Sequence, residues 1–330
     1  MSAPQTNREA RQQVASSPVQ SLSESADGPG HPALTWYAFR VLQRTMEQLP
    51  RGLAYALAIA VARIAYLTAG NARRALTQNL GAALPDASPR ELRRVVRRNF
   101  RNHSKAYADL MRLPVSRVAD LKPLLRSEGW EHLEAARAQG RGVLMVSCHM
   151  GSWEIAAAIW AATVAPVNLF AEVLEPPEMY DWYRTTRARL GISVLPLNRA
   201  GLRQVLQALD ANEIVVTAID RDITGTGIPM ELFGRCTRIP DGPAAIALRR
   251  GTPIIPVCVY RLPDDTFHGI GYEPIRAEAT GSPRSDIERT TRQLVSRIEA
   301  MIREHPDQWH MPHRIWQDPS SEAAPRSGRS

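Results

Sequence analysis

Two residues in the segment 142–158 have side chains that could carry out acid–base chemistry. His149 follows a short apolar run, and Glu154 comes five residues later, at the start of a second apolar segment. A carboxylate bonded to one imidazole nitrogen fixes the tautomer and leaves the other nitrogen to take a proton from a hydroxyl. The pair is therefore a candidate general base in which Glu154 orients His149. The alternative interpretation is a buried histidine satisfied by a capping glutamate.

The residues around this pair predict a strand that leads into a helix. Residues 143–146 form a continuous apolar run, which is typical of a strand covered on both faces. Gly151 allows a tight turn, and Ser152 is a candidate N-cap for a helix that starts at the next residue. Residues five apart on a helix point in different directions, so His149 and Glu154 meet only if His149 lies in the turn before the helix.

Short apolar runs alternate with helical patterns along the rest of the chain. Strands are predicted near residues 142–148, 167–170, 194, 214–219 and 254–260, and helices near residues 133–139, 153–163, 178–190, 200–211 and 285–303. This alternation predicts an α/β fold with a central mixed sheet flanked by helices. The mixed pairing is expected at the edge of the sheet near residues 268–272.

The N-terminal third has a different character. Residues 1–30 are rich in Ser, Gln, Pro and Gly, which predicts a disordered tail, not a signal peptide. Residues 53–70 are nearly all apolar but are short for a membrane span and include Arg63, which favours a helix at the membrane interface or in the core. We therefore predict a helical region over 31–125, an α/β core over 126–317, and a second disordered tail over 318–330.

Net charge and cysteine content narrow the class of protein. A formal charge of +8 and a pI near 9.8 favour contact with anions, such as lipid headgroups or the phosphates of coenzyme A. Nucleic acid is the weaker alternative because no zinc-finger spacing or RNA-binding motif accompanies the charge. Five arginines lie at helical spacing on one broad face, which is either solvated or apposed to an anionic membrane: Arg93, Arg94, Arg97, Arg98 and Arg101. The three cysteines form no C-x-x-C pair, which favours a cytoplasmic protein without a disulfide framework or zinc cluster.

A second polar segment follows the apolar run 214–219. Asp220 and Arg221 come directly after this run, at a predicted strand end, and are candidates for an ion pair that holds the site together. Thr237 and Arg238 precede another predicted helix and are candidates to contact the phosphates of a substrate. The alternative for residues 220–233 is a surface loop with salt bridges.

Several motifs resemble one enzyme family in the same order. The sequence HMGSWE at 149–154 resembles the H-x4-E/D motif of the lysophospholipid acyltransferase superfamily, in particular its lipid A biosynthesis late acyltransferases and phosphatidylinositol mannoside acyltransferases. Similar segments follow at 181–191, 218–234, 237–257 and 308–316. Five ordered motifs are far more specific than one histidine motif. A glycine-rich FPEG-like block is not evident, which disfavours a plain glycerol phosphate acceptor.

The resemblance implies a reaction and further site residues. His149 would deprotonate an acceptor hydroxyl, which attacks the thioester of acyl-CoA or acyl carrier protein without a metal or other cofactor. Arg187 resembles the family arginine that helps to bind the donor or the acceptor, and Glu231 is a candidate to approach His149 or to bind a sugar hydroxyl. Backbone N–H groups near Gly151, or an arginine, would stabilise the oxyanion.

The resemblance also implies where the enzyme works. The acceptor would be a glycolipid, resembling lipid A or phosphatidylinositol mannoside, on the cytoplasmic face of the inner membrane. The helical region 31–125 would be the membrane-associating part, attached peripherally or monotopically to the anionic surface, and 126–317 would be the acyltransferase core. Two alternatives from other classes stay open. One is a metal-dependent hydrolase with His149 and Glu154 as ligands, and the other is a non-catalytic basic membrane-binding protein.

Overall fold

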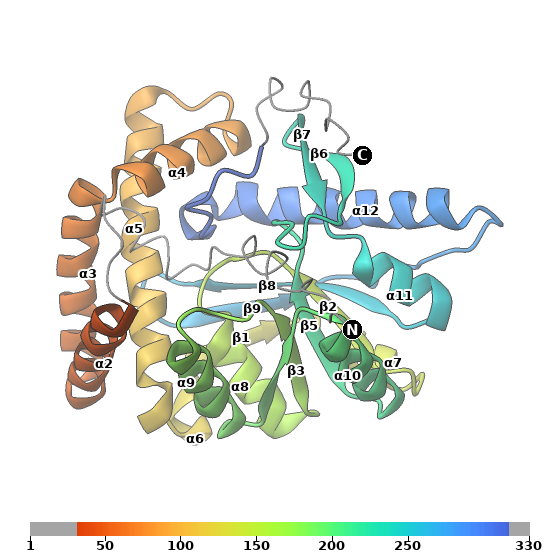
Figure 1. The fold of residues 1–330 in the computed structure, drawn as a ribbon, viewed down its shortest axis with the longest axis horizontal. Coiled ribbons are helices and arrows are strands. Elements are labelled where there is room, and N and C mark those ends of the chain that lie inside the picture. Colours follow the sequence, from red (N-terminus) through yellow and green to blue (C-terminus); the bar gives the residue numbers. More distant parts are fainter. Residues whose placement is uncertain (1–31, 317–330) are drawn as a thin grey trace, which may run out of the picture.

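A seven-stranded sheet forms the centre of the computed structural model, which describes residues 32–316 (Figure 1). The predicted tails at 1–30 and 318–330 lie outside the described residues. The strand order is β1-β9-β8-β2-β5-β3-β4, and every neighbouring pair is parallel except β8 and β9. The strands are β1 (Leu125–Glu128), β2 (Val143–Ser147), β3 (Val167–Ala171), β4 (Ile192–Pro196), β5 (Ile214–Ala218), β8 (Ile254–Arg261) and β9 (Phe267–Gly271). The predicted α/β class, with mixed pairing at β9, is confirmed.

Helices cover both faces of this sheet. They are α6 (Val118–Leu121), α7 (Trp130–Arg137), α8 (Trp153–Thr163), α9 (Pro177–Ala188), α10 (Arg199–Asp210), α11 (Gly242–Arg250) and α12 (Pro283–Glu304). Alternate residues of β2 show the two layers, because successive side chains of a strand point to opposite faces. Leu144 and Val146 pack into a core with α10, α11 and α12, whereas Val143 and Met145 pack into a core with α7, α8 and α9.

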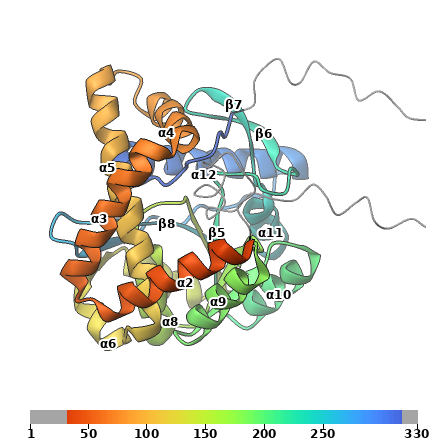
Figure 2. The ribbon, with the colours of Figure 1, turned by 60° about the vertical axis from the view of Figure 1, so that its left-hand side comes forward.

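Four helices precede the sheet and lie along one side of it. They are α2 (Pro32–Gln48), α3 (Arg51–Thr68), α4 (Gly70–Ala83) and α5 (Pro89–Arg112). A capping box begins α5: the Glu91 N–H donates to Ser88 Oγ, and the Ser88 N–H donates to Glu91 Oε2 at 2.8 Å. Figure 2 shows α2 and α3 on the outer side of α5. By length and composition α3 could cross a membrane, and 22% of it is buried.

Three strands were not predicted by the sequence pattern. Two of them, β6 (Ile228–Leu232) and β7 (Arg235–Ile239), form an antiparallel hairpin that begins within residues 220–233, for which a surface loop was the alternative interpretation. Its turn residues Phe233 and Gly234 both have positive φ, which suits a two-residue hairpin connection. Strand β1 was also missed, since it is a short edge strand whose sequence LRSE is mostly exposed and has no apolar pattern.

Candidate active site

His149 lies in the turn between β2 and α8, as the spacing predicted. Its Nδ1 is 2.8 Å from Asp220 Oδ1, and its backbone N–H donates to Asp220 Oδ2 at 2.9 Å. The Trp309 indole Nε1–H donates to the same Oδ2 at 2.8 Å. The Asp220 carboxylate is fully buried, whereas the His149 side chain is 35% exposed. The imidazole is therefore anchored through Nδ1, and Nε2 is the nitrogen that can act on a substrate.

The prediction that Glu154 orients His149 is wrong. Glu154 lies in the first turn of α8 and is buried, and its Oε1 is 3.2 Å from Arg187 Nη2 on α9. Trp153 and Tyr183 place their rings against the same guanidinium, with its carbon 5.0 and 4.8 Å from their centroids. The helix directs Glu154 towards α9, while the neighbouring parallel strand β5 brings Asp220 to His149. The two predicted metal ligands thus have different partners.

The turn after His149 is tightly built. Gly151 has φ of 61°, and a Cβ there would lie 2.0 Å from the Val259 carbonyl oxygen, so only glycine fits. The Gly151 N–H donates to the Gln308 carbonyl at 3.1 Å. The Gly151 N–H is therefore already used within the protein, and the expectation that other backbone N–H groups near this turn, or an arginine, stabilise an oxyanion stays a prediction. Ser152 occupies the N-cap of α8 as predicted, but its hydroxyl makes no capping bond and donates instead to Asp109 Oδ2 at 2.9 Å.

The C-terminal segment 307–313 closes the site from the other side. The His310 N–H donates to the His149 carbonyl at 2.7 Å, and Trp309 pairs with Met150 in an isolated bridge. Three buried asparagines on α4 and α5 fasten this segment by donating to its backbone carbonyls: Asn79 to Met311 and His313, Asn99 to Trp309, and Asn102 to Asp307. The N-terminal helices therefore hold in place the tryptophan that contacts Asp220.

A cavity of about 550 Å³ opens beside His149. Glu154, Arg187 and Arg221 also line it, so the structure brings four of the predicted site residues to one cavity. Much of the remaining wall is aromatic or aliphatic and includes Tyr107, Leu110, Trp160, Leu169, Phe170 and Tyr183. A cavity with a few polar groups and a long apolar wall suits a ligand that has both a reactive polar end and a hydrocarbon chain.

The electrostatics of the site favour a basic imidazole. Burial lowers the pKa of His149, but the charge of Asp220 and its hydrogen bond outweigh burial, so the pKa lies above the usual value. Burial opposes ionisation of Asp220, yet its bonds to His149 and Trp309 hold its pKa below the usual value. Burial raises the pKa of Glu154 despite the neighbouring Arg187. The pKa values of the two carboxyl groups are thus shifted in opposite directions, downward for Asp220 and upward for Glu154.

The remaining predicted site residues lie away from the cavity wall. Glu231 is exposed on β6. Thr237 and Arg238 are on β7, where the Thr237 hydroxyl donates to the Ile315 carbonyl and Arg238 Nε lies 3.8 Å from Asp222. Among the described residues, the cavity is lined near this hairpin by the segment 240–243 that follows β7. Substrate roles for Glu231, Thr237 and Arg238 stay predictions.

Sequence reasoning missed two groups that build the site. It assigned Asp220 to an ion pair with Arg221 and not to His149, although a carboxylate directly after a buried strand was a usable signal. It gave no role to Trp309, whose partner is 89 residues away in the chain. Among the described residues, no group of three or more His, Cys, Asp or Glu side chains is arranged to hold a metal ion.

Known acyltransferases are similar in sequence to this chain over most of its length. Residues 31–318 match the family described as bacterial lipid A biosynthesis acyltransferase. The chain is 28% identical to the phosphatidylinositol mannoside acyltransferase of Mycolicibacterium smegmatis, covering 86% of this chain and 92% of that protein. It is 26% identical to the lipid A biosynthesis lauroyltransferase of Escherichia coli, over 85% and 90% of the two chains. The solved 1-acyl-sn-glycerophosphate acyltransferase of Thermotoga maritima has 16% identity and a TM-score of 0.36, covering 76% of this chain and 97% of that chain. The chain belongs to the bacterial lipid A biosynthesis acyltransferase family and is an O-acyltransferase.

Proposed function

We propose that this enzyme transfers a fatty acyl group from acyl-CoA or acyl carrier protein to a hydroxyl of a glycolipid. The observation that carries the proposal is the 2.8 Å contact between His149 Nδ1 and buried Asp220, with the imidazole partly exposed in the cavity. A histidine held in this way by a carboxylate is a general base for a hydroxyl nucleophile.

The reaction follows from the position of the imidazole. Nε2 of His149 takes the proton of the acceptor hydroxyl, while the oxygen of that hydroxyl bonds to the carbonyl carbon of the thioester. Asp220 stabilises the resulting imidazolium, and Trp309 holds the carboxylate in place. When the tetrahedral intermediate collapses, the carbon–sulfur bond breaks and the leaving thiolate takes the proton from His149. The products are an ester and a free thiol.

Positive charge for the oxyanion comes from arginine in this proposal. Arg187 and Arg221 both line the cavity that contains His149, whereas the Gly151 N–H is bonded to Gln308. Preorganised donors in a site that excludes water stabilise developing negative charge strongly. The ion pair with Glu154 and the flanking rings hold Arg187 in one position.

The glycolipid acceptor is proposed from the relatives. One is named a phosphatidylinositol mannoside acyltransferase and another a lipid A biosynthesis lauroyltransferase, so both names specify a lipid that carries sugar or a sugar-like headgroup. The apolar wall of the cavity suits the acyl chain of the donor. We leave the headgroup unassigned between these two types.

Membrane attachment through α2 and α3 completes the proposal. Six large apolar side chains are exposed on these helices: Leu34, Tyr37, Val41, Leu53, Ile64 and Leu67. The formal net charge of the chain is +8. Exposed apolar helix faces on a basic protein suit helices that lie in an anionic membrane surface. We propose a peripheral or monotopic enzyme on the cytoplasmic face.

The proposal is tested by release of free thiol from palmitoyl-CoA or acyl carrier protein, with and without a membrane glycolipid extract. Wild type should release thiol faster when the acceptor is present, with a new acylated lipid visible by mass spectrometry. His149→Ala should lose at least about 100-fold of this activity because the general base is gone. His132→Ala, on α7 and outside the cavity wall, is the matched control and should keep it.

The opposite outcome would remove the proposal. If no donor is consumed, or if His149→Ala equals wild type, His149 is not a base for acyl transfer. Vesicle binding without thiol release would then favour the non-catalytic membrane-binding protein.

A further inference from the structure

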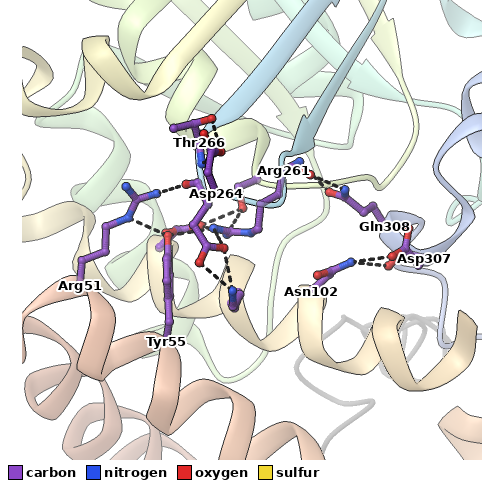
Figure 3. Close-up of polar contacts among 12 residues, drawn as sticks. Arg51, Tyr55, Asn102, Arg261, Asp264, Thr266, Asp307 and Gln308 are labelled. Carbon is purple, nitrogen blue, oxygen red and sulfur yellow. Dashed lines mark hydrogen bonds and ion pairs between the residues drawn. The ribbon is translucent and has the colours of Figure 1, made fainter. Parts of the chain in front are cut away.

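A buried cluster of charged and polar side chains lies behind the catalytic turn, where α3, α5 and the end of β8 meet (Figure 3). We call it the Arg261 cluster, and it consists of Arg51, Tyr55, Lys105, Asp109, Ser152, Arg261 and Asp265. It lies outside the cavity wall, and the proposed mechanism uses none of its members.

Arg261 and Asp109 are the centre of the cluster. Arg261 Nη1 donates to the Tyr55 hydroxyl at 2.9 Å, and Nη2 donates to Ser152 Oγ at 3.0 Å and to Asp109. Asp109 also accepts from the Tyr55 hydroxyl at 2.5 Å and from Ser152 Oγ at 2.9 Å. Tyr55 and Ser152 therefore each bond both Asp109 and Arg261, which also bond each other. The four side chains form a closed ring of hydrogen bonds contributed by α3, α5, β8 and the turn before α8.

Burying charged side chains costs free energy, so we infer that this cluster serves to fix the arrangement of the elements around it. Arg261 and Asp109 are 7% and 6% exposed, so both charges are largely removed from water. A buried ion pair is often no more stabilising than apolar side chains of the same volume, but it accepts few arrangements. Such a network fixes how its elements sit relative to each other.

The cluster reaches His149 along two short paths. Ser152 is three residues from His149, and its hydroxyl is bonded to the cluster in place of capping α8. The backbone N–H and carbonyl of Arg261 both bond the Gln308 side-chain amide at 2.7 Å. Gln308 accepts the Gly151 N–H through its carbonyl, and the next residue, Trp309, donates to Asp220.

We propose that Tyr55 of α3 is a positioning residue for His149, acting through Asp109, Arg261 and Ser152. The inference rests on the proposed function, since it assigns support for the same general base. It makes the outer apolar helix α3 part of the frame that holds the catalytic turn. The position of α3 and the orientation of His149 are therefore linked.

Tyr55→Phe is the sharpest test because it removes one hydroxyl and keeps the ring. The ring contacts with Arg51, Lys105 and Arg261, whose charged groups lie 5.1, 5.0 and 4.9 Å from its centroid, remain possible. We expect kcat per folded molecule to fall roughly tenfold, with KM for the donor within about twofold, because the base is misplaced while the cavity is intact. Tyr66→Phe on the same helix is the matched control and should leave kcat unchanged.

A second variant tests whether Tyr55 acts on His149 through Ser152. Ser152→Ala should lower kcat by a similar factor, and the double variant should lose little more than the larger single loss, since both hydroxyls act through the same ring. Losses that multiply in the double variant would overturn the route through Ser152.

An NMR titration of the His149 imidazole separates this inference from the proposed function. In Tyr55→Phe the bond to Asp220 should loosen, and the pKa of His149 should fall from its raised value, whether or not an acyl acceptor has been found. Tyr66→Phe should leave that pKa unchanged. If Tyr55→Phe alters neither the pKa of His149 nor kcat per folded molecule, Tyr55 is no positioning residue.

Discussion

The His149–Asp220 pair and the Arg261 cluster are both built from buried polar groups, but they leave different amounts of side chain exposed. The His149 side chain is 35% exposed and is held through one ring nitrogen, whereas the Arg261 side chain is 4% exposed and bonds Tyr55, Asp109 and Ser152. A group that reacts needs an atom without a permanent partner, and a group that positions others needs all its donors used. The contrast agrees with the two proposed roles, general base for His149 and positioning for the Arg261 cluster.

The largest effect is expected at Asp220, the carboxylate that contacts His149. Asp220→Asn should lower kcat by roughly 10³-fold, because the imidazolium loses its stabilising charge and the tautomer is no longer fixed. Steady-state thiol release measures this loss. Asp210→Asn, an exposed ion-pair partner of Arg250, is the matched control and should have normal activity. Normal kcat in Asp220→Asn would show that another group orients His149.

Asp220→Asn should also change the pH dependence of activity. His149 acts as a base only when neutral, so wild-type activity should fall as the pH drops through its raised pKa. Without the charge of Asp220, burial dominates and the pKa of His149 falls, so the acid limb of the kcat/KM profile should move to lower pH. An acid limb that moves to higher pH would contradict the electrostatic role of Asp220.

A smaller effect is expected at the second carboxylate. Glu154→Gln should lower kcat by about tenfold to 100-fold, because Arg187 loses its ion-pair partner and its fixed position. The acid limb of the pH profile should stay where it is in wild type, since His149 contacts Asp220. Measuring the pH profiles of both variants side by side would decide which carboxylate orients His149. An acid-limb shift in Glu154→Gln as large as that in Asp220→Asn would restore Glu154 as the orienting group.

The smallest effect is expected at the far end of α5. Ser88→Ala removes the capping box of the helix that carries Asp109, and should lower the thermal unfolding midpoint by roughly 2 °C without changing kcat. Calorimetry and thiol release measure the two quantities. A fall in kcat as large as in Tyr55→Phe would mean that any weakening of α5 disturbs catalysis, and the specific role of Tyr55 would be lost.

Elements with a strong local pattern were predictable. The helix expected at 153–163 is α8, and the apolar runs at 214–219 and 254–260 became β5 and β8. Elements with a weak pattern were not: β1 is exposed, and the glycines and proline at 225–229 concealed the start of the β6–β7 hairpin. Propensity and periodicity report on a few neighbouring residues, so they fail where pairing or burial is decided elsewhere in the fold.

The sequence by itself determined where the proposed base, His149, lies. The apolar run before His149, the glycine at 151 and the helical pattern after it are local features, and they place an imidazole between a buried strand and a helix. Only the tertiary structure decided its partner, because Asp220 is 71 residues away. β2 and β5 are parallel neighbours with Ser147 opposite Ala218, so their carboxyl ends meet at one edge of the sheet. Strand order is a property of the whole fold, and for that reason the nearby Glu154 was the wrong choice.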